Sequence, residues 1–279
     1  MEKKWKNTIK AGGLMALPSI AGISLFYIMP LLEMAVRAFI RNSDKVFVGF
    51  ENYHQVFGNH AFRLASGNTV LFMAVSVPLL IVLSMLFSNL LVHTSGFFAH
   101  ARRAYVLPLA VPAAAVALFW KAFWGKKGLL NLFTHMEIDW LQSGWGFAVL
   151  VCVFLWKYFG YTVILWIGGI RNLEQEMLEA AQAEGAGRWQ VFFKIILPNM
   201  KGTFFTIYTL SLINSSRIFR ETYALVGDYP HNSMYLMQNL FNNWLRNFEF
   251  DKLAAGGSIY LAAMVVLIVP VGKALRDGQ

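Results

Sequence analysis

The chain has 279 residues, of which 57% are hydrophobic and 14% are charged, and its formal net charge is +9. With a mean hydropathy of +0.50, this composition excludes a water-soluble domain of that length. The single cysteine, Cys152, excludes an internal disulfide, and the six histidines are scattered without the spacing of metal ligands. We therefore expect an all-α polytopic membrane protein without a metal site.

Six apolar runs are long enough to cross about 30 Å of hydrocarbon, which takes about 20 helical residues. In chain order the runs are residues 14–39, 68–92, 104–124, 145–170, 203–226 and 255–275. The first run is too long for a cleaved signal peptide and lacks a convincing small-residue cleavage site, so we interpret it as a span. The sequence predicts one transmembrane domain, residues 1–279, with six transmembrane helices.

Lysines and arginines are distributed unequally between alternate loops. If both termini are cytoplasmic, the inner segments hold 12 of the 24 cations, the outer loops hold seven, and five lie within or at the ends of spans. Because Lys and Arg are retained on the cytoplasmic side, this bias predicts cytoplasmic N- and C-termini. The net positive charge then reflects topology and does not indicate nucleic-acid binding.

Polar and charged side chains interrupt the fourth and fifth runs. The fourth run contains Lys157, Tyr158 and Tyr161, and the spacing places Lys157 and Tyr161 on one helix face. The fifth run contains a second polar set, namely Ser211, Asn214, Ser215, Arg217, Arg220 and Glu221. Charged groups at bilayer depth are costly unless they face a cavity or a partner, so each is a candidate functional residue.

These polar residues allow more than one interpretation. Hydroxyls and amides beside aromatic rings suit a sugar site, but serines in membrane helices also hydrogen-bond neighbouring helices. The three cations suggest an anionic saccharide, such as a uronate-containing or sulfated oligosaccharide, held by charge-assisted hydrogen bonds. Against this, Glu221 is close enough along the helix to neutralise Arg217 or Arg220, and Lys157 can be structural.

A charged, helix-forming segment, residues 171–202, separates the fourth and fifth runs. Its centre, residues 179–198, reads EAAQAEGAGRWQVFFKIILP. Good helix formers precede Gly185 and Gly187, which interrupt the helix because glycine accepts a left-handed backbone. A second short helix then carries Trp189 and other apolar residues. The pattern predicts two short cytoplasmic helices at an angle with exposed aromatic side chains; the alternative is an amphipathic loop on the membrane surface.

The segment resembles the coupling loop of type I ABC importer permeases, and residues 14–275 resemble their carbohydrate-uptake branch, which includes the maltose-transporter permeases. The LPLAVP sequence at 107–112 and the DYP sequence at 228–230 also resemble this family. There, the Glu-Ala-Ala helix inserts into a groove on the ATPase subunit. Carried over, the resemblance implies these ATPase-coupling residues: Glu179, Ala180, Ala181, Gly185, Trp189, Ile195, Leu197 and Pro198. Glu184 stands where many relatives have Asp.

The resemblance also implies the partners of the chain. It implies a permease subunit in the bacterial cytoplasmic membrane, surrounded by lipid, with a second homologous permease, two ATPase subunits and an extracellular or periplasmic solute-binding protein. ATP and Mg²⁺ would bind the ATPases, and the chain has no Walker lysine motif, so we expect no cofactor and no catalytic residue here.

In relatives that hold sugar within the membrane, contacts come from the third, fourth and fifth spans. Positions here that match those contacts include Leu109, Ala113 and Phe154. The predicted substrate-binding set is Lys157, Tyr158, Tyr161, Ser211, Asn214, Ser215, Arg217 and Arg220. Two alternatives stay open: a permease for another polar solute, such as glycerol phosphate or a peptide, and a secondary transporter, which leaves the coupling-loop pattern unexplained.

Overall fold

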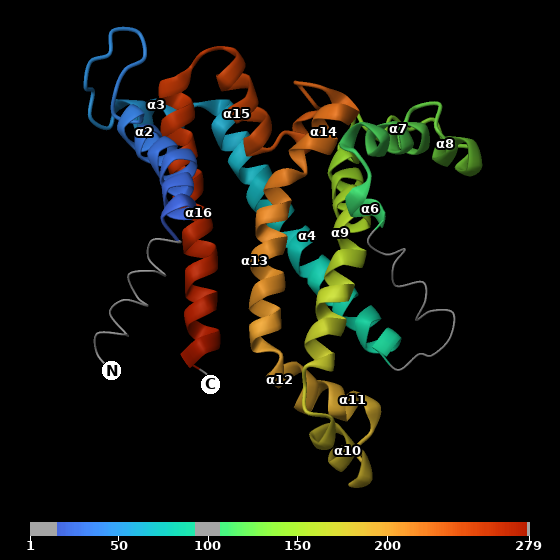
Figure 1. Cartoon of the computed structure of the whole chain (residues 1–279). Coiled ribbons are helices and arrows are strands. Elements are labelled where there is room, and N and C mark those ends of the chain that lie inside the picture. The colour runs from blue at the N-terminus through green and yellow to red at the C-terminus, as the bar shows by residue number, and fades with distance from the viewer. Residues whose placement is uncertain (1–15, 93–106, 278–279) are drawn as a thin grey trace, which may run out of the picture. The chain divides into compact units, whose positions relative to one another are not determined.

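The computed structural model describes residues 16–92 and 107–277, which are mostly helical (Figure 1). Within these ranges, β pairing is limited to an isolated bridge between Ile40 and Phe47. Packing divides the chain into two compact units, one made of residues 1–59 and 243–263 and the other of residues 60–242 and 264–279. The start of the third predicted run, residues 104–106, and the first two residues of the first run lie outside the described residues.

The helical elements follow one another in this order: η1 Ser24–Ile28, α2 Met29–Arg37, α3 Glu51–Gly58, α4 His60–Val92, α6 Leu107–Ala110, α7 Ala113–Trp124, α8 Leu129–Thr134, α9 Gly146–Arg171, α10 Gln175–Ala183, α11 Arg188–Val191, η3 Phe192–Ile196, α12 Leu197–Asn199, α13 Lys201–Arg217, α14 Phe219–Val226, η4 Asn232–Met234, α15 Met237–Arg246 and α16 Phe250–Asp277. Here η1 and η3 are π-helical and η4 is a 3₁₀ turn.

Four helices in the described ranges are long and apolar enough to cross a membrane. They are Ala16–Arg37, His60–Val92, Gly146–Arg171 and Phe250–Leu275, and they correspond to the first, second, fourth and sixth predicted runs. The second helix begins at residue 60 rather than 68, and the last at residue 250 rather than 255, because amphipathic turns extend each helix beyond its apolar run.

The third and fifth predicted runs are interrupted rather than continuous helices. Between α6 and α7, Pro112 has a ψ of 142° and ends the helical path, since proline lacks an N–H and restricts the residue before it. Figure 1 shows α6 beside α9 and α7 leading away from it. Between α13 and α14 the break is the single residue Ile218. Continuous helices therefore account for four of the six predicted spans.

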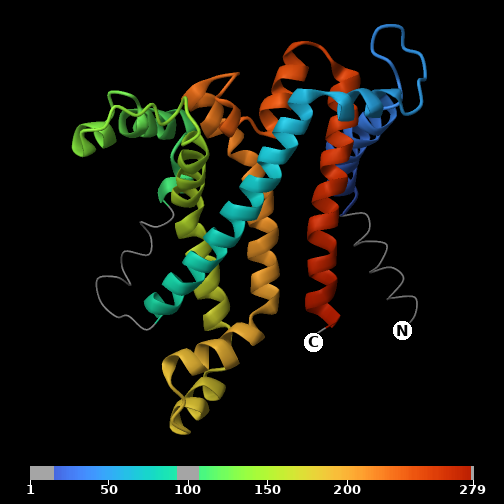
Figure 2. The ribbon, with the colours of Figure 1, turned by 180° about the vertical axis from the view of Figure 1, so that it is seen from behind.

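The core of the second unit forms where α4 crosses α9 (Figure 2). Phe72 of α4 meets Phe154 of α9 edge-to-face, with ring centroids 5.5 Å apart. Leu150, Ile218 and their neighbours complete this buried cluster. Burial of large apolar side chains at this crossing stabilises the unit and fixes the position of the polar residues of α9 and α14.

Helices α9 and α13 approach each other closely at Gly169. A Cβ added to Gly169 would lie 2.6 Å from the side chains of both Met200 and Thr203. Only glycine allows this separation, because real Cβ contacts are not that short. The two helices that flank the segment α10–α12 are therefore in direct backbone-to-side-chain contact near their ends.

In the first unit, α2 lies beside the start of α16. The sulfur of Met34 lies 3.1 Å from a Cβ built on Gly257, and the hydroxyls of Tyr53 and Ser258 are 3.0 Å apart. A short hairpin follows α2, in which the N–H of Arg41 donates to the carbonyl of Val46 at 2.9 Å. These contacts set the ends of two candidate membrane spans side by side.

Candidate functional site

Two helices of the second unit bring opposite charges together. Lys157 of α9 and Glu221 of α14 form an ion pair, with 12% and 2% of their side chains exposed. A lone buried charge is expensive, so each residue neutralises the other. The carboxylate of Glu221 thus pairs with a lysine on another helix, and not with Arg217 or Arg220 as the spacing along α14 suggests.

An aromatic ring borders this ion pair. The ammonium of Lys157 lies 5.7 Å from the ring centroid of Tyr158, and the Tyr158 ring packs against Phe154 at 5.0 Å. The second oxygen of the Glu221 carboxylate, Oε2, is buried and has no hydrogen-bond partner in the described part of the chain. The ion pair is therefore closely packed, but one of its carboxylate oxygens lacks a hydrogen bond within the described residues.

Two arginines adjoin the ion pair and remain accessible. Arg217 and Arg220 are both exposed, and both are near enough to Tyr158 for their charges to act on its hydroxyl. Among residues 16–92 and 107–277, no hydrogen bond or ion pair holds either guanidinium. An unpaired, accessible guanidinium is well suited to a carboxylate or sulfate because its N–H groups form a planar fork.

The rest of the predicted binding set divides between buried and half-buried positions. Ser211, Asn214 and Ser215 of α13 are buried, and the hydroxyl of Ser215 donates to the carbonyl of Leu212 at 2.6 Å. Tyr161 is half-buried, one turn after Lys157. This hydrogen bond supports a structural role for Ser215, whereas Arg217 and Arg220 provide accessible polar groups.

The positions matched in the third run lie on two separate helices. Leu109 of α6 is exposed and Ala113 of α7 is half-buried, whereas Phe154 of α9 is fully buried. Since Phe154 lies in the core, its side chain shapes the site through Tyr158 and offers no surface to a ligand.

A pocket of about 490 Å³ borders α14 beyond the two arginines. Its walls include Lys121, Lys126 and Asp139, and the residues from Tyr223 of α14 to Gly227. Tyr223 follows Arg220 by one helical turn, so both belong to one face of α14. The one signal for this pocket in the sequence is Lys121, a cation inside an apolar run.

The segment between α9 and α13 begins with α10, which ends at a glycine. Gly185 has a φ of +81°. The N–H of Ala186 donates to the carbonyl of Ala181, and the N–H of Glu184 to that of Ala180, each at 3.0 Å. This is the pattern in which a left-handed glycine satisfies the last carbonyls of a helix. The predicted helix break at Gly185 is present.

The second half of this segment exposes aromatic side chains. Trp189 and Phe193 stack with ring centroids 6.0 Å apart, and each is 54% exposed, while Phe192 is buried. Glu179, Ala180 and Pro198 are exposed, and Ala181, Ile195 and Leu197 are half-buried. The segment therefore presents an acidic and small-residue face on α10 and an aromatic pair after Gly185.

No group of three or more His, Cys, Asp or Glu side chains positioned to hold a metal ion occurs among the described residues.

Comparison with known proteins decides the family. Residues 100–276 match the family described as the inner membrane component of binding-protein-dependent transport systems. The chain belongs to this family. Its members are components of transport systems, which agrees with the expectation of a permease and not an enzyme.

Relatives of similar length extend the comparison over nearly the whole chain. The chain is 25% identical over 270 residues to the osmoprotective compounds uptake permease protein GgtC of Synechocystis sp., covering 91% of this chain and 93% of the relative. It is 26% identical over 284 residues to the trehalose/maltose transport system permease protein MalF of Thermococcus litoralis, covering 96% and 95%. It is 24% identical to the lactose transport system permease protein LacF of Rhizobium radiobacter, covering 92% and 91%.

Solved structures share the fold. A chain of a bacterial ABC transporter involved in import of the acidic polysaccharide alginate superposes with a TM-score of 0.85 at 20% identity, covering 99% of both chains. A second structure, of a bacterial alginate ABC transporter in complex with an alginate pentasaccharide-bound periplasmic protein, gives 0.83 at 19% identity, covering 98% of this chain and 97% of that chain. The chain thus has the fold of an ABC importer permease.

Proposed function

We propose that this chain is the permease subunit of an ABC importer for oligosaccharides that carry acidic groups. Family membership supports the transport role, and the relatives that are lactose and trehalose/maltose transport system permeases support a carbohydrate. The observation that carries the acidic substrate is the pair of accessible arginines, Arg217 and Arg220, next to a lysine that is already neutralised by Glu221.

The three cations differ in their ion-pair partners, and we assign their roles accordingly. A carboxylate or sulfate approaching α14 meets two guanidiniums with free N–H groups, and each charge-assisted hydrogen bond to them is strong. Lys157 has little to offer such an anion because its side chain is only 12% exposed and its charge is compensated by Glu221. Tyr158 and Tyr161 supply aromatic faces against which sugar rings pack. We therefore assign anion recognition to Arg217 and Arg220.

The same proposal covers the assembly and the membrane topology. The chain has six spans in the bacterial cytoplasmic membrane with both termini in the cytoplasm, the interrupted third and fifth runs included. It pairs with a second permease, receives solute from a binding protein, and is driven by two ATPase subunits that bind ATP and Mg²⁺. Coupling passes through the exposed face of α10 and the supporting apolar residues, namely Glu179, Ala180, Ala181, Gly185, Trp189, Ile195, Leu197 and Pro198.

Uptake into proteoliposomes tests the proposal. Vesicles contain the whole importer and its binding protein, with ATP on the ATPase side, and receive neutral or uronate-containing oligosaccharides of equal length. Arg217→Gln and Arg220→Gln are expected to reduce uptake of the acidic sugar about tenfold each, the equivalent of one lost charge-assisted hydrogen bond. Arg63→Gln, which removes an exposed cation from the start of α4, is the matched control.

Three results contradict the proposal in different ways. Equal uptake of neutral and acidic sugars, with equal effects of the arginine variants on both, excludes anion recognition but leaves a sugar importer. Uptake that continues without ATP excludes the ABC mechanism and favours a secondary transporter. ATP-dependent uptake of glycerol phosphate or a peptide in preference to any sugar identifies another polar solute.

A further inference from the structure

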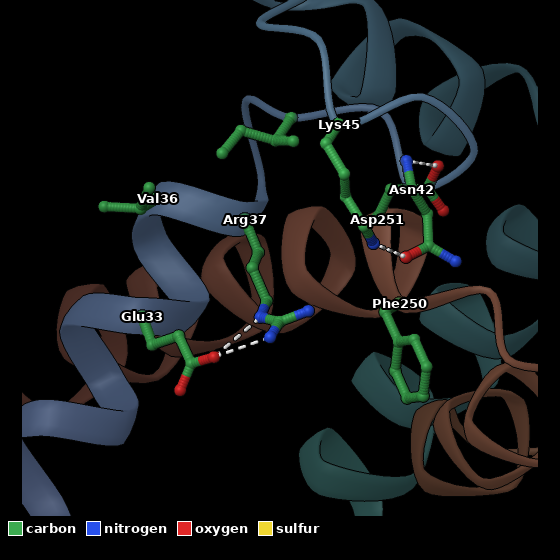
Figure 3. A pocket seen from close by; sticks show the side chains of 8 residues that line it. Glu33, Val36, Arg37, Asn42, Lys45, Phe250 and Asp251 are labelled. Carbon is green, nitrogen blue, oxygen red and sulfur yellow. Dashed lines mark hydrogen bonds and ion pairs between the residues drawn. The ribbon is translucent and has the colours of Figure 1, made fainter.

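A pocket of about 310 Å³ lies in the first unit, where α2 ends and α16 begins. Both helices are candidate membrane spans, so the pocket lies at one end of the hydrocarbon layer, at the depth of lipid headgroups. Its volume is at the lower end of the range for small-molecule sites. Figure 3 shows its walls, which are Val36, Ile40 and Phe250 on the apolar side and Glu33, Arg37, Asn42, Lys45 and Asp251 on the polar side.

Arg37 has hydrogen-bond donors to spare in this pocket. Its Nε and Nη2 both donate to the same oxygen of Glu33, Oε1, at 2.9 and 2.6 Å, and Figure 3 shows the two side chains pointing toward each other. A guanidinium has five N–H groups, so three are unassigned within the described residues. The other carboxylate oxygen of Glu33 is likewise unassigned there.

Lys45 is held above the pocket by the hairpin that follows α2. Its φ is 60°, a left-handed conformation that costs a residue with a side chain about 1 kcal/mol and that often marks a functional position. Its ammonium donates to Oδ1 of Asn42 at 3.1 Å, which leaves two of three donors. Arg41, which lies between the wall residues Ile40 and Asn42 in the sequence, is instead bound to Glu51 and Asp44.

Asp251 is already satisfied. One of its oxygens accepts the N–H of Asn42 at 3.1 Å and the other accepts the N–H of Lys252 at 2.9 Å. The groups left to recognise a ligand are therefore donors on Arg37 and Lys45 and one acceptor on Glu33. The pocket thus holds two cations and two carboxylates, next to apolar side chains at the end of two spans, which matches a zwitterionic amphiphile that carries both a phosphate and an ammonium.

We propose that this pocket binds the headgroup of phosphatidylethanolamine. Arg37 and Lys45 hold the phosphate, the free oxygen of Glu33 accepts the ammonium, and Val36 and Phe250 contact the first part of the lipid tails. Basic side chains in pockets between membrane helices can bind lipid headgroups, and the two carboxylates favour a zwitterionic headgroup over an anionic one here. An anionic phospholipid without the ammonium gives the second oxygen of Glu33 no partner, and it faces the negative charges of Glu33 and Asp251.

Lipid retention by the intact importer tests this site. The purified complex is delipidated, supplied with phosphatidylethanolamine or phosphatidylglycerol of identical acyl chains, and the bound lipid is counted by native mass spectrometry. Lys45→Met and Arg37→Met are expected to weaken phosphatidylethanolamine binding about fivefold each. Glu33→Gln is expected to remove the preference for phosphatidylethanolamine over phosphatidylglycerol while keeping phosphate binding.

The controls separate this site from other lipid contacts. Lys127→Met removes an exposed lysine far along the chain from the pocket walls and is expected to bind both lipids as the wild type does. Soluble glycerophosphoethanolamine, which has the headgroup without tails, is expected to bind much more weakly than the lipid. Three results overturn the proposal: equal binding of the two lipids by the wild type, unchanged retention in Lys45→Met and Arg37→Met, or equal binding of the soluble headgroup.

Discussion

The ammonium of Lys157 reaches the carboxylate of Glu221 from a different helix, and both side chains are largely withdrawn from solvent. In a buried pair of this kind the loss of one partner is more harmful than the loss of both, because the remaining charge stays buried without compensation. The pair therefore acts as a structural contact between α9 and α14, and it leaves recognition of anions to Arg217 and Arg220.

This role predicts that replacing Lys157 alone lowers the stability of the complex more than replacing Lys157 and Glu221 together. Lys157→Met is expected to lower the free energy of unfolding by about 3 kcal/mol, because Glu221 is left buried without its cation. The double variant Lys157→Met/Glu221→Gln is expected to regain most of that loss. Thermal unfolding of the purified complex in detergent measures both. Equal destabilisation by the single and double variants would show that the pair does not hold the two helices together.

The sequence predicts which residues carry charge in the apolar runs, but not how they pair. Spacing along one helix suggests that Glu221 neutralises Arg217 or Arg220, since only neighbours within a turn are visible in a sequence. The partner in the structure is Lys157, 64 residues away. Arg217 and Arg220 lack an ion-pair partner among the described residues because Glu221 pairs with Lys157. A local sequence pattern does not reveal such a contact between distant residues.

At the scale of elements, the segment between α9 and α13 shows why a short sequence pattern can specify a local fold. Gly185 adopts a φ of +81°, and a Cβ added there would meet no atom within 4 Å. The requirement for glycine is therefore conformational and not steric. A larger side chain has room at this position, but the residue must adopt a left-handed backbone conformation.

Two alanine substitutions test this requirement. Gly185→Ala is expected to destabilise α10 by about 1 kcal/mol, because alanine is unfavourable at positive φ. Gly202→Ala, which lies in α13 and also meets no atom within 4 Å, is expected to be neutral or stabilising by about 0.5 kcal/mol. Thermal unfolding of the two variants gives the comparison. If both alanines shift the unfolding temperature in the same direction, the cap at Gly185 is not the cause.

Element boundaries are predictable where polar or turn-forming residues bound an apolar run. The fourth run, predicted at residues 145–170, becomes α9 at Gly146–Arg171. The third and fifth runs are also predicted as spans, but they are divided at Pro112 and Ile218. Hydropathy measures whether a segment tolerates lipid, and it does not report whether the backbone stays straight. Pro112 is visible as a helix breaker in the sequence, whereas nothing local marks Ile218.

For the whole molecule, the proposed topology places the segment α10–α12 and the loop after α7 on opposite sides of the membrane. We expect a cysteine at Lys127 to react with a membrane-impermeant maleimide on intact cells, and one at Glu176 to react only after permeabilisation, in a background where Cys152 is replaced by Ala. Both positions are exposed. Labelling of Glu176→Cys on intact cells would reverse the predicted orientation.

Gly169 allows two long helices of the second unit, α9 and α13, to approach each other closely. The chain enters α10 from α9 and leaves α12 into α13, and at Gly169 those two helices touch so closely that a single methyl group does not fit between them. The close approach of the two helices that support the segment α10–α12 therefore depends on glycine at residue 169. A side chain at this position would have to displace Met200 or Thr203, and with them the junction between α12 and α13.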